Sequence, residues 1–325
     1  MKLTLLLLAL TTGAAFAATE ENITTNLPAT SGGSLVVDVD FGNIEVTTNS
    51  TDDVAIHVWR KISWGSAEKE KKYLSDNSVV IGQEGNTVTV RSRPKVKEKS
   101  GWFGGFGKQN EAKYTIQVPA RFNARPNTSG GDIVVSNLTG EVKADTSGGE
   151  LRFVQLHGTL NGGTSGGNIH AAGCDGPIKL RTSGGDIQVI DGAGSLEGGT
   201  SGGDITVRTF LGAASVHTSG GSLKIENVAG QIEGGTSGGS VLAVLVSPLP
   251  GKVSLGTSGG DVTVKVPKDA AFNLNAETSG GDVRCDLPVT VQGKLKSDRI
   301  QGPVNGGGPE LKLRTSGGNI HVKKM

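Results

Sequence analysis

The sequence is poor in the residues on which many enzymes and membrane proteins depend. Of its 325 residues only 4% are aromatic, two are cysteine and two are methionine, and the net charge is +1. This charge gives no general electrostatic basis for binding nucleic acid. The sparse aromatics argue against stacking platforms for sugars. No apolar run is long enough to span a membrane.

Common catalytic and metal-binding patterns are also missing. The chain has no P-loop, no dinucleotide-binding fingerprint and no Ser-His-Asp or Cys-His constellation. The histidines are scattered and have no metal-ligand spacing: His57, His157, His170, His217 and His321. We therefore predict no catalytic residue, no metal and no cofactor.

What the chain has in abundance is glycine, with 52 residues, and one recurring tetrapeptide. A fixed period in a sequence is the mark of a solenoid, in which each repeat is one coil stacked on the last. Thr-Ser-Gly-Gly recurs every 18 residues from Thr128 to Thr236 and at other spacings elsewhere: at Thr30, Thr128, Thr146, Thr164, Thr182, Thr200, Thr218, Thr236, Thr257, Thr278 and Thr315.

Within one period, apolar residues alternate with polar ones in two short stretches. Ile187 and Val189 follow one Gly-Gly pair, and Leu196 lies in the second stretch of the same coil. Alternation with period 2 predicts strands with one buried face. The same parity turns the repeated threonine inward, where its hydroxyl can bond to backbone or to the next threonine. The glycines are expected at the two corners of each coil. We predict an all-β, parallel β-solenoid of 18-residue, two-strand coils, and leave its handedness open.

Three regions are expected. Residues 1–17 are typical of a signal peptide, with Lys2, an apolar run and an Ala-Phe-Ala cleavage site. Residues 18–127 are predicted to form a β-rich cap with a short helix from Ser66 to Leu74. Residues 128–325 are the solenoid, and the lysines at its end suit an exposed last strand.

The two cysteines, Cys174 and Cys285, are far apart in this arrangement. They are separated by about six coils, or about 29 Å on the spacing between strands. A disulfide needs Cα atoms within about 7 Å. We therefore predict two free, buried thiols.

A polar column follows each Gly-Gly pair, and it is the strongest hint of enzymatic chemistry. Asp186 and Asp204 are expected to be neighbours about 5 Å apart, a spacing found for the carboxylates of retaining glycosidases. The same is expected of Asp261 and Asp282. However, the column also accepts serine and asparagine, which bond to local backbone N–H groups. A structural role is therefore preferred. A calcium roll is disfavoured because the opposite corner lacks acidic partners.

One segment near the end of the cap is basic, then aromatic and rich in glycine. Residues 60–113 contain 12 lysines or arginines against 6 aspartates or glutamates. Such a segment can touch anionic lipid, lipopolysaccharide or a partner, or it can be a solvated hairpin. The candidate binding residues are Arg91, Arg93, Lys95, Lys97, Lys99, Trp102, Phe103 and Phe106.

The pattern resembles a bacterial family of secreted or envelope-attached β-strand-repeat proteins described as adhesins of unknown function. The resemblance rests on Gly33–Val46, on Tyr114–Pro119, on the Thr-Ser-Gly-Gly-Asp-Ile copies and on Gly306–Ile320. It implies a β-solenoid in the cell envelope and carries over no catalytic residue.

We therefore expect a non-enzymatic, exported protein, periplasmic or at the cell surface, that acts as a scaffold or an adhesin-like interaction surface. Two alternatives stay open. One is a β-helix that binds or cleaves polysaccharide, and the other is an envelope-stress sensor that binds anionic membrane. The partner is unknown; an envelope protein, a glycan or an anionic lipid would fit, and nucleic acid would not.

Overall fold

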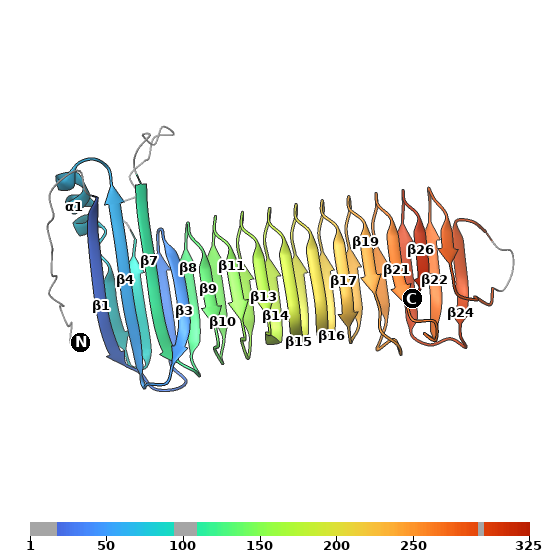
Figure 1. The fold of residues 1–325 in the computed structure, drawn as a ribbon, viewed down its shortest axis with the longest axis horizontal. Coiled ribbons are helices and arrows are strands. Elements are labelled where there is room, and N and C mark those ends of the chain that lie inside the picture. Colours follow the sequence, from blue (N-terminus) through green and yellow to red (C-terminus); the bar gives the residue numbers. More distant parts are fainter. Residues whose placement is uncertain (1–17, 94–108, 292–295) are drawn as a thin grey trace. The chain divides into compact units, whose positions relative to one another are not determined.

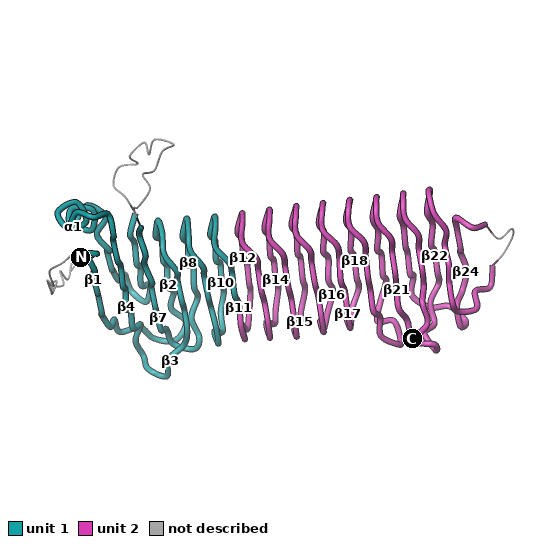
Figure 2. Tube along the Cα trace, turned by 45° about the horizontal axis from the view of Figure 1, so that its top comes forward, with its two compact units in different colours: residues 1–152 teal, residues 153–325 magenta. Residues whose placement is uncertain are grey.

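The computed structural model describes residues 18–93, 109–291 and 296–325. The signal peptide expected at residues 1–17 lies outside the described residues. The described chain is all-β with one helix, as predicted. It divides into two compact units, one ending at Arg152 and one running from Phe153 to Met325 (Figure 2). No helix among the described residues is long and apolar enough to cross a membrane.

Unit 1 holds the helix and the first strands (Figure 1). Its elements are β1 (Thr19–Pro28), β2 (Ser34–Val39), β3 (Asn43–Asn49), β4 (Asp53–Ser63), α1 (Ala67–Asp76), β5 (Val80–Glu84), β6 (Thr87–Ser92), β7 (Gln109–Pro119), β8 (Asn123–Thr128), β9 (Ile133–Ser136) and β10 (Val142–Thr146).

The coil made by β2 and β3 is inserted between strands that follow it in the chain. β2 pairs in parallel with β6 on one side and with β8 on the other. β3 likewise pairs in parallel with β7 and β9. Both series of parallel strands end in antiparallel strands. In one series β4 pairs with β7 and with β1, and in the other β5 pairs with β6. The sequence predicted this early coil but not its insertion.

The predicted helix is present and slightly longer than expected, since α1 ends at Asp76. Ser66 occupies the N-cap position, as predicted, but its side chain makes no capping hydrogen bond. Its carbonyl instead accepts the first helical hydrogen bond, from the N–H of Glu70 at 3.0 Å. The strand before Pro119 ends at that proline, as predicted.

Unit 2 is a stack of mostly parallel strands (Figure 1). Its elements, beginning with the strand that crosses the unit boundary, are β11 (Leu151–Val154), β12 (Leu160–Gly163), β13 (Ile169–Ala172), β14 (Asp175–Arg181), β15 (Ile187–Gly199), β16 (Ile205–His217), β17 (Leu223–Val228), β18 (Ile232–Gly235), β19 (Val241–Val244), β20 (Val253–Gly256), β21 (Val262–Val266), β22 (Phe272–Thr278), β23 (Val283–Cys285), β24 (Arg299–Val304), β25 (Glu310–Thr315) and β26 (Ile320–Lys324).

Neighbouring strands in the middle of unit 2 pair with partners 18 residues away. Ile187 lies opposite Ile205, and Leu196 lies opposite Ala214. Both apolar columns point inward and are at most 3% exposed at these four positions. The predicted inward faces are therefore confirmed. In β15 and β16 the two predicted short strands of a coil run on as one.

The repeated threonine ties each corner to the coil before it. The hydroxyl of Thr200 donates to the carbonyl oxygen of Gly185 at 2.9 Å and accepts the N–H of Gly203 at 3.3 Å. The side chain is only 8% exposed. The inward direction is confirmed, and the partners are backbone groups. The same two bonds are made by Thr182, Thr218, Thr236, Thr257, Thr278 and Thr315.

The corners need glycine because the coils approach closely there. A Cβ on Gly203 would lie 2.1 Å from the carbonyl oxygen of Gly185, which is too close for any side chain to fit.

The opposite corner of the coils holds a column of residues whose backbone lies in the left-handed region, and the sequence does not reveal this column. Its members include Asp191 and Thr209, both with φ of 53°. A β-branched residue there is unusual.

The end of the chain does not form an exposed last strand, so that prediction is wrong. β26 pairs in parallel with β21 on one side and β23 on the other. β25 lies in the same way between β20 and β22. The last coil is thus inserted between two coils that precede it in the chain. The series of strands that contains β20, β25 and β22 ends instead at β24, which is antiparallel to β22 and contains Pro303.

The cysteines are both free, as predicted. Cys174 is buried, with 2% of its surface exposed. Cys285 is only partly buried, so the prediction of a buried thiol is wrong at that position. Cys285 is the last residue of the three-residue strand β23, which pairs with β26.

Removing one threonine hydroxyl should weaken the stack. We expect Thr200→Val to lower the free energy of unfolding by about 1–3 kcal/mol, because it leaves the buried carbonyl of Gly185 and the partly buried N–H of Gly203 without these partners. Urea unfolding followed by circular dichroism measures the change. The matched control is Thr206→Val, on the outward face of the same coil, for which we expect little change. Equal effects of the two substitutions would contradict the role of the hydroxyl.

Candidate functional site

Of the eight residues predicted to bind a partner, the structure describes two. Arg91 lies on β6, and Arg93 directly follows that strand. The other six lie outside the described residues: Lys95, Lys97, Lys99, Trp102, Phe103 and Phe106. Arg91 and Arg93 both belong to unit 1, at the start of the basic segment.

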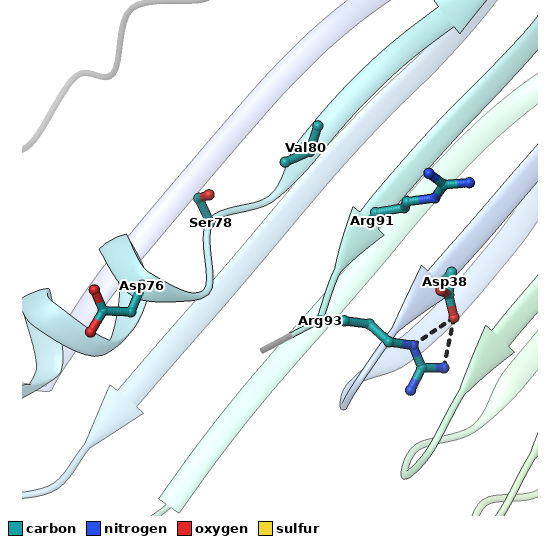
Figure 3. A pocket seen from close by; sticks show the side chains of 6 residues that line it. All are labelled: Asp38, Asp76, Ser78, Val80, Arg91 and Arg93. Carbon is teal, nitrogen blue, oxygen red and sulfur yellow. Dashed lines mark hydrogen bonds and ion pairs between the residues drawn. The ribbon is translucent and has the colours of Figure 1, made fainter. Parts of the chain in front are cut away.

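Both arginines line a small surface pocket (Figure 3). Its centre is a row across three strands, in which Val80 of β5 lies opposite Arg91 and Arg91 lies opposite Asp38 of β2. Asp76, at the end of α1, and Ser78 complete a lining around about 180 Å³. Val80 is 60% exposed. The pocket thus offers an apolar side chain beside a guanidinium.

The two arginines differ in what they touch. Arg93 turns back to the sheet, where its Nε donates to Asp38 Oδ1 at 2.7 Å (Figure 3). Its Nη1 donates to Ser129 Oγ at 3.1 Å. Arg91 is exposed and makes no hydrogen bond or ion pair with any described residue. Arg93 therefore fastens strands together, and Arg91 is the group available to a partner.

A buried arginine sets the direction of these side chains. Arg60 of β4 is 0% exposed. Its guanidinium forms a salt bridge with Glu21, donates to the carbonyl of Asn77 at 2.6 Å and donates to Ser92 Oγ at 3.3 Å. Because Ser92 is held inward, its neighbours on β6 must face outward. Sequence reasoning missed Arg60, since one arginine in a basic region carries no visible sign of burial.

Helix α1 is anchored beside this cluster by Glu70, which is 2% exposed. Its carboxylate accepts the N–H of Trp64 at 2.7 Å and both the N–H and the hydroxyl of Thr19, at 3.1 and 2.7 Å. Burial raises the pKa of Glu70, but these hydrogen bonds outweigh burial and hold the pKa below its ordinary value of 4.5. The helix that supplies Asp76 to the pocket is thereby fixed to β1.

The polar column after each Gly-Gly pair is used for inter-coil bonds. Asp186 Oδ1 accepts the N–H of Asp204 at 2.8 Å, and Asp204 Oδ1 accepts the N–H of Ser222 at 2.7 Å. The first pair are neighbours, as predicted. An amide or hydroxyl oxygen accepts equally well, which explains why Asn168 and Ser222 occupy the same column. The preferred structural role of the column is supported by these bonds.

The second predicted carboxylate pair is wrong. Asn319 lies between its members, because its N–H donates to Asp261 Oδ1 at 2.7 Å and its Oδ1 accepts the N–H of Asp282 at 3.0 Å. The inserted last coil separates the two aspartates. Among the described residues no group of three or more His, Cys, Asp or Glu side chains could hold a metal ion.

Comparison with family models identifies the fold family. The Toastrack DUF4097 model matches residues 32–323. The chain belongs to this family. The resemblance that the sequence suggested is confirmed by this match. A search of curated proteins found no match.

Two solved structures with a similar fold show the degree of likeness. A "putative adhesin" of Bacteroides fragilis is 14% identical, with 93% of this chain and 97% of that chain covered and a TM-score of 0.33. A "putative lipid binding protein" of Parabacteroides distasonis is also 14% identical, with 93% and 96% covered and a TM-score of 0.39. Similarities this distant do not bear on function.

Glu70 should make the stability of the protein depend on pH. Its pKa is lowered on folding, so its charge stabilises the fold above the pKa of the unfolded chain, and this contribution is lost as the pH falls toward the folded value. We expect Glu70→Gln to unfold at lower urea than wild type at pH 7, and the gap to shrink below about pH 5. Urea midpoints measured from pH 7 to pH 3 test this. The exposed Glu84→Gln is the control, and a gap that does not change with pH would contradict the assignment.

Proposed function

We propose that the protein is an exported, non-enzymatic component of the cell envelope that acts as an interaction surface. Its binding element is the pocket around Arg91 together with the basic and aromatic segment that follows it in sequence. The observation that carries the proposal is the contrast between the two arginines. Arg93 is bonded to Asp38 and Ser129, whereas Arg91 is exposed, without a partner among the described residues, beside the exposed Val80.

The chemistry of this element fits a partner that is both acidic and apolar. A guanidinium supplies charge and directional donors, and Val80 supplies exposed apolar surface. The six other candidate residues follow in the sequence: Lys95, Lys97, Lys99, Trp102, Phe103 and Phe106. Basic segments with interfacial aromatics are attracted to anionic membrane surfaces. Of the partners considered, an anionic lipid surface matches this composition best, and glycans or an envelope protein remain the alternatives.

The enzymatic alternative has weaker support. The carboxylates that would act as a catalytic pair, Asp186 and Asp204, each accept a backbone N–H from the next coil. A carboxylate that fixes the register of the stack in this way serves the fold without a substrate. The export of the protein is supported by the signal-like residues 1–17.

Binding of the mature chain to vesicles tests the proposal. We expect binding to phosphatidylglycerol-containing vesicles and not to neutral vesicles. Arg91→Gln should weaken it about fivefold, since one basic residue near an anionic surface contributes about 1 kcal/mol. The matched control is Lys143→Gln, an exposed cation on β10, which should bind like wild type. Flotation assays at two salt concentrations provide the measurement.

A second variant lacks residues 95–107, which leaves β6 and β7 intact. It should lose vesicle binding while keeping the wild-type circular dichroism spectrum. Vesicle binding that survives both changes would contradict a role for this element. Binding to a glycan array with no vesicle binding would replace the membrane partner with a carbohydrate.

A further inference from the structure

A second charged surface lies in unit 2, on the outward face of β21, β26 and β23. These three strands are neighbours in the order β21, β26, β23, and Figure 1 shows β21 and β26 side by side. Lys265 lies directly opposite Lys323, and His321 lies directly opposite Arg284. Lys324 lies opposite the buried Val266 and so does not belong to this row of outward side chains. We call Lys265, Arg284, His321 and Lys323 the basic face.

The basic face differs from two other clusters of cations on the outward faces of unit 2. In those clusters the cations pair with an acid of their own or a neighbouring coil. Glu197 forms ion pairs with Lys179 and Arg181, with N–O distances of 3.0 and 2.5 Å. Glu226 likewise receives Arg208 and Lys224, at 2.9 and 3.1 Å. Acids placed between bases offset their repulsion.

The basic face has a single acid within its hydrogen-bond network, and that acid is occupied. Asp286 binds His321 at 2.9 Å and accepts the backbone N–H of Lys324 at 3.3 Å. The hydrogen bond from His321, with the nearby charge of Lys323, holds the pKa of Asp286 below its ordinary value. Lys265, Arg284 and Lys323 make no ion pair with any described residue.

This arrangement is a product of the inserted last coil. Without β26, the strands β21 and β23 would be neighbours, and Lys323 would not lie beside Lys265. Like charges directly opposite each other on adjacent strands destabilise a sheet. The fold therefore maintains an unfavourable cluster of cations that an anionic ligand would relieve.

The shape of the basic face indicates what kind of ligand it fits. It is the face of a sheet, so it cannot enclose a small molecule. Lys265 and Lys323 are one strand spacing apart, about 4.8 Å, which is close to the advance of one sugar in an extended polysaccharide. No aromatic side chain on β21, β26 or β23 is available for insertion into a bilayer.

We propose that the basic face binds an extended acidic polysaccharide, one that carries a carboxylate on each sugar. The carboxylates lie along the stacking direction and pair with Lys265 and Lys323, which face each other on adjacent strands, while Arg284 contacts the polymer from one outward position away on β23. The charge of the polymer takes the place of counter-charges such as those that Glu197 and Glu226 supply elsewhere in unit 2. This surface belongs to unit 2 and is separate from the Arg91 pocket, so either can fail without the other.

Polygalacturonate is the probe, and Lys265→Glu of the mature full-length chain is the main variant. The substitution converts a repulsive pair with Lys323 into an attractive one, so it should unfold at the same temperature as wild type or slightly higher. Its affinity for polygalacturonate should fall at least tenfold. The matched control is Lys224→Glu, which changes the net charge equally on the same sheet and should bind like wild type. A second variant, Arg284→Gln, should weaken binding severalfold.

Affinity electrophoresis and biolayer interferometry at low and high salt measure these effects. Binding should weaken as salt rises, because exposed charges are screened, and neutral dextran should not bind. The proposal is overturned if wild type does not bind polygalacturonate at low salt, or if Lys265→Glu binds as well as wild type. It is also overturned if Lys224→Glu loses as much affinity, or if dextran binds equally. Binding to anionic vesicles alone would assign the face to a membrane instead and would also overturn it.

Discussion

The fold depends on hydrogen bonds between side-chain oxygens at the corners of one coil and the backbone of a neighbouring coil. At these corners glycines bring two backbones so close that no side chain fits between them. Backbone groups buried there need partners. The Thr200 hydroxyl serves two of them, on Gly185 and Gly203, and Asp186 serves a third, on Asp204. These hydrogen bonds fix the register between neighbouring coils. The fixed register aligns the inward apolar residues of successive coils into columns.

This use of side chains also decides where function can lie. Threonine and aspartate are the residues that recur, yet their oxygens are committed to backbone partners. What varies from coil to coil is the outward face, where charged side chains are free to differ. Cations without an ion pair to a described residue lie at the pocket around Arg91 in unit 1 and at the basic face around Lys265 in unit 2.

Both surfaces owe their composition to an inserted coil. In unit 1, β2 lies between β6 and β8, which places Asp38 next to Arg91 and lets it hold Arg93. In unit 2, β26 lies between β21 and β23, which places Lys323 next to Lys265. Insertion of a coil thus brings together side chains that are far apart in the sequence. Both insertions occur outside the part of the chain that repeats every 18 residues.

The same distinction explains what could be predicted from the sequence. Coils joined by a constant period pair locally, so the inward columns and the Asp186–Asp204 contact follow from counting residues. The inserted coils pair with distant partners, so counting placed Asp261 beside Asp282 and missed Asn319 between them. The burial of Arg60 was equally invisible, because it depends on Glu21, on Ser92 and on a carbonyl after α1.

The central claim is that the last coil is inserted, and one cross-linking measurement tests it directly. In a chain with Cys174→Ala and Cys285→Ala, cysteines are placed at positions 263 and 321, or at 263 and 284. Adjacent strands lie about 4.8 Å apart and next-but-one strands about 9.6 Å apart, whereas a disulfide needs Cα atoms within about 7 Å. The inserted arrangement predicts that Thr263→Cys with His321→Cys forms a disulfide on mild oxidation of the folded protein. A disulfide in Thr263→Cys with Arg284→Cys, and none in the first pair, would contradict it.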